Sequence, residues 1–115
     1  MKPAEAKDWA AELAAAIVVC DAQGTIIYLN RQAEIDFEAD GGAQLLGKNV
    51  LDCHPEPART KLQDLLWNQK SHVYTVEKGG IKKLICQVPW SKEGKYAGLV
   101  EISLVIPSHL PHYIR

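Results

Sequence analysis

The most chemically suggestive stretch of the sequence is Cys53-His54-Pro55, in a segment that two prolines interrupt. A neutral imidazole is a good metal ligand, and a cysteine thiolate is both a ligand and a nucleophile. Adjacent residues rarely bind one ion together, and the other two cysteines, Cys20 and Cys86, fall in different predicted strands. A histidine at this point can also cap the following helix. We therefore expect no metal site, and His54 is either a ligand or a structural residue.

The other candidates for chemistry are isolated. His109 and His112 share the C-terminal tail but have no further ligands beside them. Ser91 and Ser103 have no base nearby in the sequence. The chain contains no Gly-x-Ser-x-Gly motif, no phosphate-binding glycine loop and no paired carboxylates at an apolar site. We therefore expect that the protein is not an enzyme.

Composition and charge exclude several classes of partner. Thirteen basic and fourteen acidic side chains give a net charge of −1, and the lysines of the 78–83 hairpin lack an aromatic platform, so we expect no nucleic acid. No apolar run approaches the roughly 20 residues that span a bilayer, so we expect no membrane partner. The three cysteines lack the spacing of a disulfide framework, which favours reduced thiols and a cytoplasmic location.

The predicted elements that position the candidate residues begin with a hairpin that leads directly into a helix. Two β-rich runs, 17–20 and 25–29, flank a polar loop that ends at Gly24, which can take the positive φ that a tight turn needs. Asn30 is a preferred N-cap for a short helix over 31–37. Its place after the second strand predicts a strand–helix junction.

The N-terminal residues 1–16 are predicted to form a helix that packs on another surface. Residues 3–16 are rich in Ala, Glu and Leu, and Trp9, Leu13 and Ala16 form a narrow apolar stripe. A helix this short is marginal alone, so it must dock on another surface. That surface is either the protein's own sheet or a second copy in a homodimer.

A longer helix is predicted from residue 57 to about residue 69, after a short helical turn over 43–50. Three strands follow at 72–77, 81–90 and 96–106, and Gly79-Gly80 is suited to a type I′ turn between the first two. This register places Val73 opposite Cys86 on the more apolar face, which we expect to face inward.

Together these elements predict an α+β fold. The two early and three late strands must share one five-stranded antiparallel sheet, because neither set is stable alone, and the helices between them cover one face. The expected organisation is an N-terminal helix (1–16), one domain (17–107) and a C-terminal tail (108–115).

At this point the sequence resembles a PAS domain. The resemblance rests on Asp21-x-x-Gly24-x-Ile26-x-Tyr28-x-Asn30-x-x-Ala33, then Leu45-Leu46-Gly47-Lys48, then Gly94-Lys95-Tyr96-x-Gly98. It implies a sheet and a helical wall that enclose a sensory pocket, as in signal-transduction modules that detect small ligands, redox state or light. Cys53-His54-Pro55 also resembles a tripeptide that a subset of these modules carries before the longer helix.

The resemblance implies a ligand pocket in the seam between the sheet and the helices. The candidate pocket residues are Cys53, His54, Leu46, Val50, Leu62, Leu66, Leu84, Cys86, Val88, Val100 and Ile102. The same residues would also form the core, so a ligand-free structural dimerisation domain is an alternative. A haem-binding sensor is another, because haem-binding PAS modules take an axial histidine from the helical side and His54 lies near that region.

One departure from the family pattern concerns output. PAS strands commonly lead into an Asp-Ile-Thr junction and a signalling helix, whereas here Glu101-Ile102-Ser103 leads to Pro107. The chain is therefore either an excised piece or acts through association. In the second case the N-terminal helix is the better candidate for a homodimer contact.

Overall fold

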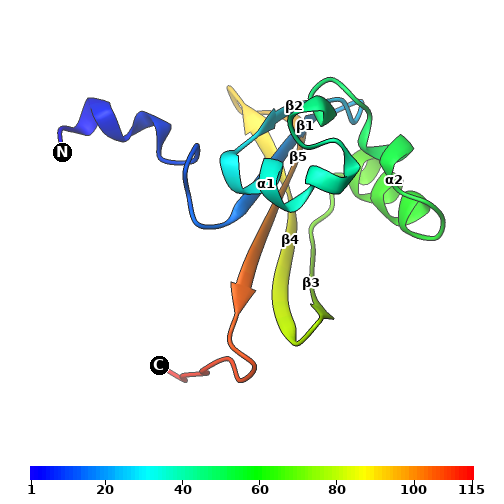
Figure 1. Cartoon of the computed structure of the whole chain (residues 1–115). Helices are drawn as coiled ribbons and strands as arrows, with labels where there is room; N and C mark the ends of the chain where they lie inside the picture. The colour runs from blue at the N-terminus through cyan, green and yellow to red at the C-terminus, as the bar shows by residue number, and fades with distance from the viewer.

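The computed structural model describes the fold of residues 1–115 and every side chain except that of Lys7 (Figure 1). Its helices and strands are, in chain order, the 3-10 helix η1 (Pro3–Asp8), β1 (Ala16–Asp21), β2 (Ile26–Leu29), α1 (Arg31–Asp36), the 3-10 helices η2 (Glu38–Asp40), η3 (Gly42–Leu45) and η4 (Val50–Cys53), α2 (Ala58–Asn68), β3 (His72–Lys78), β4 (Ile81–Lys92) and β5 (Lys95–Ile106). No helix in this described part of the chain is long and apolar enough to cross a membrane.

The strands form one sheet in the order β2-β1-β5-β4-β3. Every neighbouring pair is antiparallel, and β1 joins the early hairpin to β5 of the late strands. The helices α1 and α2 and the turns between them lie against one face (Figure 1). The predicted α+β fold with a five-stranded antiparallel sheet is confirmed.

Local turn residues set the loops of the β1–β2 and β3–β4 hairpins. Gly79 and Gly80 have φ values of 61° and 79°, and they bring Val73 opposite Cys86 as predicted. In the first hairpin the Asp21 carboxylate accepts the backbone N–H groups of Gln23 and Thr25. The conformation of each of these two loops is therefore determined by residues within the loop itself.

Asn30 joins the hairpin to α1 as its N-cap. Its Oδ1 accepts the backbone N–H of Ala33 at 3.0 Å and that of Ile17 at 2.9 Å. Its Nδ2 donates to the carbonyl oxygens of Ala10 and Ala15 at 2.9 and 2.8 Å. The predicted cap is confirmed, and the same side chain also holds β1 and the segment before it.

The N-terminal segment differs from the predicted helix over 3–16. Only η1 is helical, as a short 3-10 helix without a side-chain cap, and turns follow over residues 9–12. Trp9 and Leu13 are 64% and 38% exposed, and the segment projects from the body of the molecule (Figure 1). A short Ala-rich helix that buries no apolar face is marginal, so the local preference is not sufficient here.

The helix α2 supplies the buried side chains that pack against the sheet. Leu62, Leu65 and Leu66 are buried with Cys20 and Leu99 in the core, whereas Trp67 is exposed. The hydroxyl of Tyr96 on β5 donates to the carbonyl oxygen of Leu66 at 2.8 Å. This bond fixes the C-terminal end of α2 to the sheet.

The predicted inward face of the late strands is wrong. Lys83 on β4 forms an ion pair with Asp36 of α1 at 3.6 Å, so it faces the helices. Strand side chains alternate between faces, so Ile85 and Gln87 share that side with Lys83. The residues that face away from the helices are therefore Leu84, Cys86, Val88, Val100 and Ile102. The prediction chose the face with more apolar side chains, but the face toward the helices carries polar groups because it lines a cavity.

Candidate functional site

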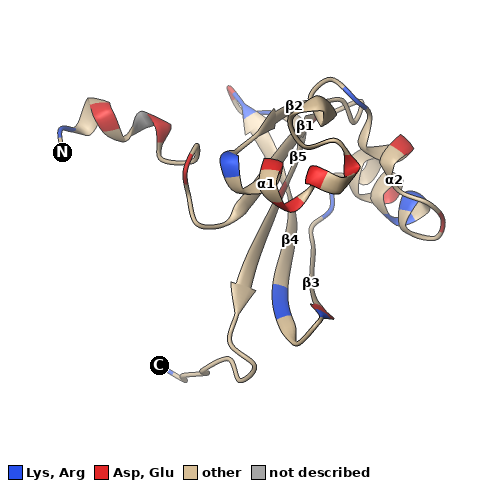
Figure 2. Cartoon of the chain, in the orientation of Figure 1, with Lys and Arg blue, Asp and Glu red and all other residues tan. Residues whose placement is uncertain are grey.

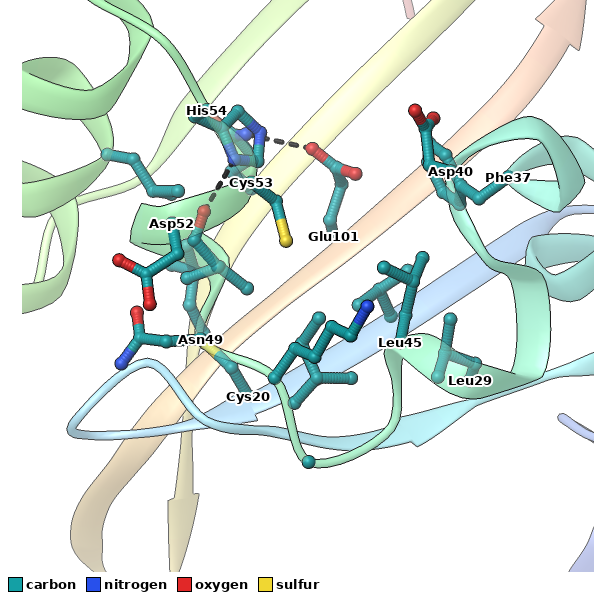
Figure 3. A pocket seen from close by; sticks show the side chains of 18 residues that line it. Cys20, Leu29, Phe37, Asp40, Leu45, Asn49, Asp52, Cys53, His54 and Glu101 are labelled. Atoms are coloured by element: carbon teal, nitrogen blue, oxygen red, sulfur yellow. Dashed lines mark hydrogen bonds between the residues drawn. The ribbon is translucent and has the colours of Figure 1, made fainter.

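A cavity of about 780 Å³ lies between the sheet and the helical side of the domain (Figure 3). This volume is in the range of small-molecule sites, roughly 300–1,000 Å³. Its apolar wall is formed by side chains of β1, β2, β5, α2 and the short helices and turns after α1, namely Val18, Cys20, Ile26, Leu29, Phe37, Leu45, Val50, Leu62 and Leu99. Its polar lining side chains are Asp40, Lys48, Asn49, Asp52, Cys53, His54, Gln87 and Glu101.

The polar part of the sheet wall is a cross-strand pair. Gln87 on β4 and Glu101 on β5 lie directly opposite each other. The Gln87 Nε2 donates to Glu101 Oε1 at 2.9 Å, and Gln87 is only 7% exposed. Burying an amide or carboxylate is unfavourable without a hydrogen bond. Gln87 therefore supplies one hydrogen bond to the Glu101 carboxylate, and this carboxylate faces the cavity (Figure 3).

His54 lies immediately after η4, at the edge of the cavity. Its Nδ1 lies 2.7 Å from the carbonyl oxygen of Val50. A carbonyl oxygen only accepts, so Nδ1 carries the proton, and in the neutral ring Nε2 keeps its lone pair. The half-buried imidazole is thereby held in one orientation with a free acceptor nitrogen.

A smaller hollow adjoins the main cavity, and His54, Leu62 and Gln87 line both. His72 and Tyr74 of β3 complete its sheet side, with their ring centroids 4.7 Å apart. Burial raises the pKa of the Tyr74 hydroxyl, and the Glu101 carboxylate adds to this rise. The hydroxyl is therefore a proton donor throughout the neutral range.

The cysteines differ in environment. All three are free thiols. Cys20 is buried, and this burial raises the pKa of its thiol, which keeps it in the less reactive neutral form. Cys53 is exposed at the cavity edge beside His54. Among the described residues, no group of three or more His, Cys, Asp or Glu side chains could hold a metal ion.

The structure brings together four of the predicted pocket residues, namely Cys53, His54, Val50 and Leu62. The others lie elsewhere. Leu46 is 56% exposed and Leu66 is buried within the core. The five strand residues predicted for the pocket, Leu84, Cys86, Val88, Val100 and Ile102, lie on the opposite face of the sheet.

Sequence reasoning missed the polar wall, and a signal for it was present. Gln87 and Glu101 are polar residues in the middle of two apolar strands. A register that pairs them would have placed both on one face, where an isolated polar pair indicates a lined cavity.

The sheet and the helical cover, with the cavity between them, define a single α+β domain. A family model described as "PAS fold" matches residues 11–69, which is more than half of the chain. The chain belongs to the PAS family. A search of curated proteins found no match.

Solved structures of PAS and related domains share this fold. A C-terminal domain from Streptococcus mutans is 18% identical, with a TM-score of 0.69 over 91% of this chain and 85% of that one. The PAS domain of Bordetella pertussis BvgS is 15% identical, with a TM-score of 0.65 over 91% and 86%. The Vibrio cholerae Aer2 receptor, described as a dual PAS-heme oxygen sensor, is 20% identical, with a TM-score of 0.59 over 81% and 95%. At these identities the likeness concerns the fold.

Proposed function

We propose that this protein is a sensory module of signal transduction that binds a small molecule in the cavity between the sheet and the helices. The observation that carries the proposal is the 780 Å³ cavity, whose lining combines an apolar wall with polar side chains, among them the hydrogen-bonded His54, Gln87 and Glu101. Similar folds occur in the histidine kinase ThkA and in a Vibrio cholerae sensor histidine kinase, which is consistent with a signalling role. The module acts by binding and not by catalysis. Its free thiols are consistent with a cytoplasmic location.

The test is a cavity-filling substitution with a matched control on the neighbouring residue. Val18 lines the cavity, whereas Val19 faces the other side of β1. Native mass spectrometry of the purified protein should detect a co-purifying small molecule. Val18→Phe should abolish its retention and Val19→Phe should keep it. Equal retention by both variants would remove the cavity as the binding site.

His54 favours haem as a second candidate ligand. The Nδ1 contact to Val50 leaves Nε2 available, which is the arrangement that an axial histidine needs. The three carboxylates in the cavity lining disfavour it, because haem carries two negatively charged propionates. Addition of haem should give a Soret absorption band that His54→Ala removes and His72→Ala keeps. Absence of this band in the unaltered protein rules out haem.

We also propose that the N-terminal segment, residues 1–14, is a homodimer contact. It exposes Trp9 and Leu13 away from the rest of the domain. Sedimentation should give a dimer mass for the unaltered protein and a monomer mass for the double variant Trp9→Ala, Leu13→Ala. Trp67→Ala removes an equally exposed tryptophan on α2 and serves as the control. A dimer without any retained ligand would favour the alternative of a ligand-free structural dimerisation domain.

A further inference from the structure

We propose that the cavity selects a ligand that carries a protonated nitrogen on an apolar or aromatic body. The inference rests on the proposed function, because it names the chemical class of the molecule that the cavity binds. It is carried by the position of Glu101 in the cavity wall and by the charges around the cavity.

The Glu101 carboxylate is only partly satisfied by the protein. Gln87 donates to Oε1, and among the described residues no other donor reaches this carboxylate. None of the described lysine or arginine side chains forms an ion pair with it. A carboxylate in a partly buried cavity attracts a positive charge more strongly than one in water. An ammonium or amidinium group on the ligand supplies both the charge and the missing donors.

A second acceptor points to the same class. The Nδ1–H of His54 donates to the Val50 carbonyl oxygen, so in the neutral ring Nε2 can only accept. The polar groups of Glu101 and His54 therefore offer acceptors and no free donor. A ligand whose polar group donates hydrogen bonds is complementary to both.

The charges around the cavity oppose an anion. Asp40, Asp52 and Glu101 line it, and Lys48 is the one lining lysine or arginine within the described residues. Acidic residues also follow one another along α1 and the turn after it, beside Phe37 (Figure 2). The resulting field favours a cation and disfavours a carboxylate or phosphate ligand.

The apolar part of the cavity indicates the chemical character of the rest of the ligand. Leu29, Phe37 and Leu45 lie together on the side away from His54 (Figure 3). They can cover an aromatic or aliphatic body while its nitrogen reaches Glu101. Phe37 adds a ring face near which a cation is also favoured.

The experiment compares three probes that share one indole body: tryptamine (cationic), tryptophol (neutral) and indole-3-acetate (anionic). Each is titrated into the ¹⁵N-labelled protein, and chemical-shift changes are followed at the Gln87 side-chain amide. A charge-assisted hydrogen bond contributes about 1.5–3 kcal/mol, which corresponds to an affinity ratio of roughly 10 to 100. We expect tryptamine to bind at least about tenfold more tightly than indole-3-acetate.

Glu101→Gln tests the residue itself. The new amide oxygen can still accept from Gln87, so the fold should persist. This variant should lose the preference for tryptamine, whereas Glu77→Gln, which removes an exposed carboxylate of β3 outside the cavity, should keep it. Indole-3-acetate binding as tightly as tryptamine to the unaltered protein would overturn the inference and leave the proposed function standing. If no probe binds and no molecule co-purifies, both are wrong.

Discussion

At the scale of single residues, Asn30 does more than cap a helix, because its side chain also bonds to three other points of the chain. Its carboxamide bonds the first turn of α1, the start of β1 and two carbonyl oxygens of the preceding segment. It is buried, so each lost bond would leave a backbone group without its partner. The residue therefore specifies how the hairpin, the helix and the N-terminal segment meet.

Substitution of Asn30 should be more costly than loss of a helix cap alone. We expect Asn30→Ala to lower the free energy of unfolding by about 2–4 kcal/mol, since it removes a cap and two donor contacts. Urea denaturation measures this change. Asn30→Asp retains the acceptor oxygen but places a buried carboxylate oxygen against the carbonyl oxygens of Ala10 and Ala15, so it should be destabilising as well. A loss below about 1 kcal/mol for Asn30→Ala would contradict this interpretation.

Glu56, just before α2, makes a pH-dependent contribution to the free energy of unfolding. Its carboxylate accepts from the side chain and the backbone N–H of Thr60, and these bonds lower its pKa. A lowered folded-state pKa adds stability above the unfolded value of about 4.5, and this stability is lost as the pH falls through the folded-state pKa. The contribution therefore exists at neutral pH and disappears in acid.

Glu56→Gln should accordingly lower stability at neutral pH but not in strong acid. The two proteins should differ in urea midpoint at about pH 7 and converge near about pH 2.5. The exposed Glu12→Gln change serves as a control that should leave both midpoints unaltered. A constant difference across the whole range would show that the contact with Thr60 does not depend on the charge.

At the scale of elements, the close approach of β5 to β1 depends on Gly98. It lies opposite Asp21, with a φ of 152°, and a Cβ there would overlap the carbonyl oxygen of Cys20. That oxygen accepts the indole N–H of Trp90 at 3.0 Å. The missing side chain thus allows three strands to meet beside the cavity.

Gly98→Ala should therefore be among the most destabilising single changes in the chain. The added methyl group meets backbone atoms that cannot move independently, so we expect a loss of more than about 3 kcal/mol. Gly94→Ala is the matched control, since Gly94 also has a positive φ but has open space around it. Its cost should be about 1–2 kcal/mol from backbone strain alone. Equal losses in thermal or urea unfolding would show that the close approach is unimportant.

The elements that were predictable from sequence are those with local signals. Gly79-Gly80 sets the β3–β4 register, Asn30 caps α1, and the leucine spacing sets the buried face of α2. The face of the late strands was not predictable from apolar content, because the face toward the helices carries polar groups that line the cavity. Only the longer-range contact of Lys83 with Asp36 and the paired Gln87 and Glu101 distinguish the two faces.

The candidate site was predictable only in the residues that stand out by their type, and not in the partners that surround them. Cys53 and His54 stand out by residue type and do line the cavity. The partners that give them a chemical environment come from β4 and β5, about 30 to 50 residues further along the chain. Their approach depends on sheet order and strand phase, which no local pattern encodes.

At the scale of the whole molecule, the two ends of the chain differ in how they are attached. Residues 108–115 are exposed and have no regular structure. In the described part of the N-terminal segment, the hydrogen bonds to the domain come from its second half. Asn30 holds Ala10 and Ala15, and the backbone N–H of Arg31 donates to the Ala11 carbonyl oxygen at 3.0 Å.

Two deletions should separate these parts. Removal of residues 1–8 takes away η1 and leaves the contacts with Asn30 and Arg31, so the free energy of unfolding should change by less than about 0.5 kcal/mol. Removal of residues 1–15 leaves the buried donors of Asn30 unpaired, and we expect a loss of at least about 2 kcal/mol. Removal of residues 108–115 is the control and should be neutral. Urea denaturation of the three truncated proteins measures each effect. A large loss on removal of residues 1–8 alone would mean that η1 packs on the domain in solution, where it could not also serve as an exposed contact between copies.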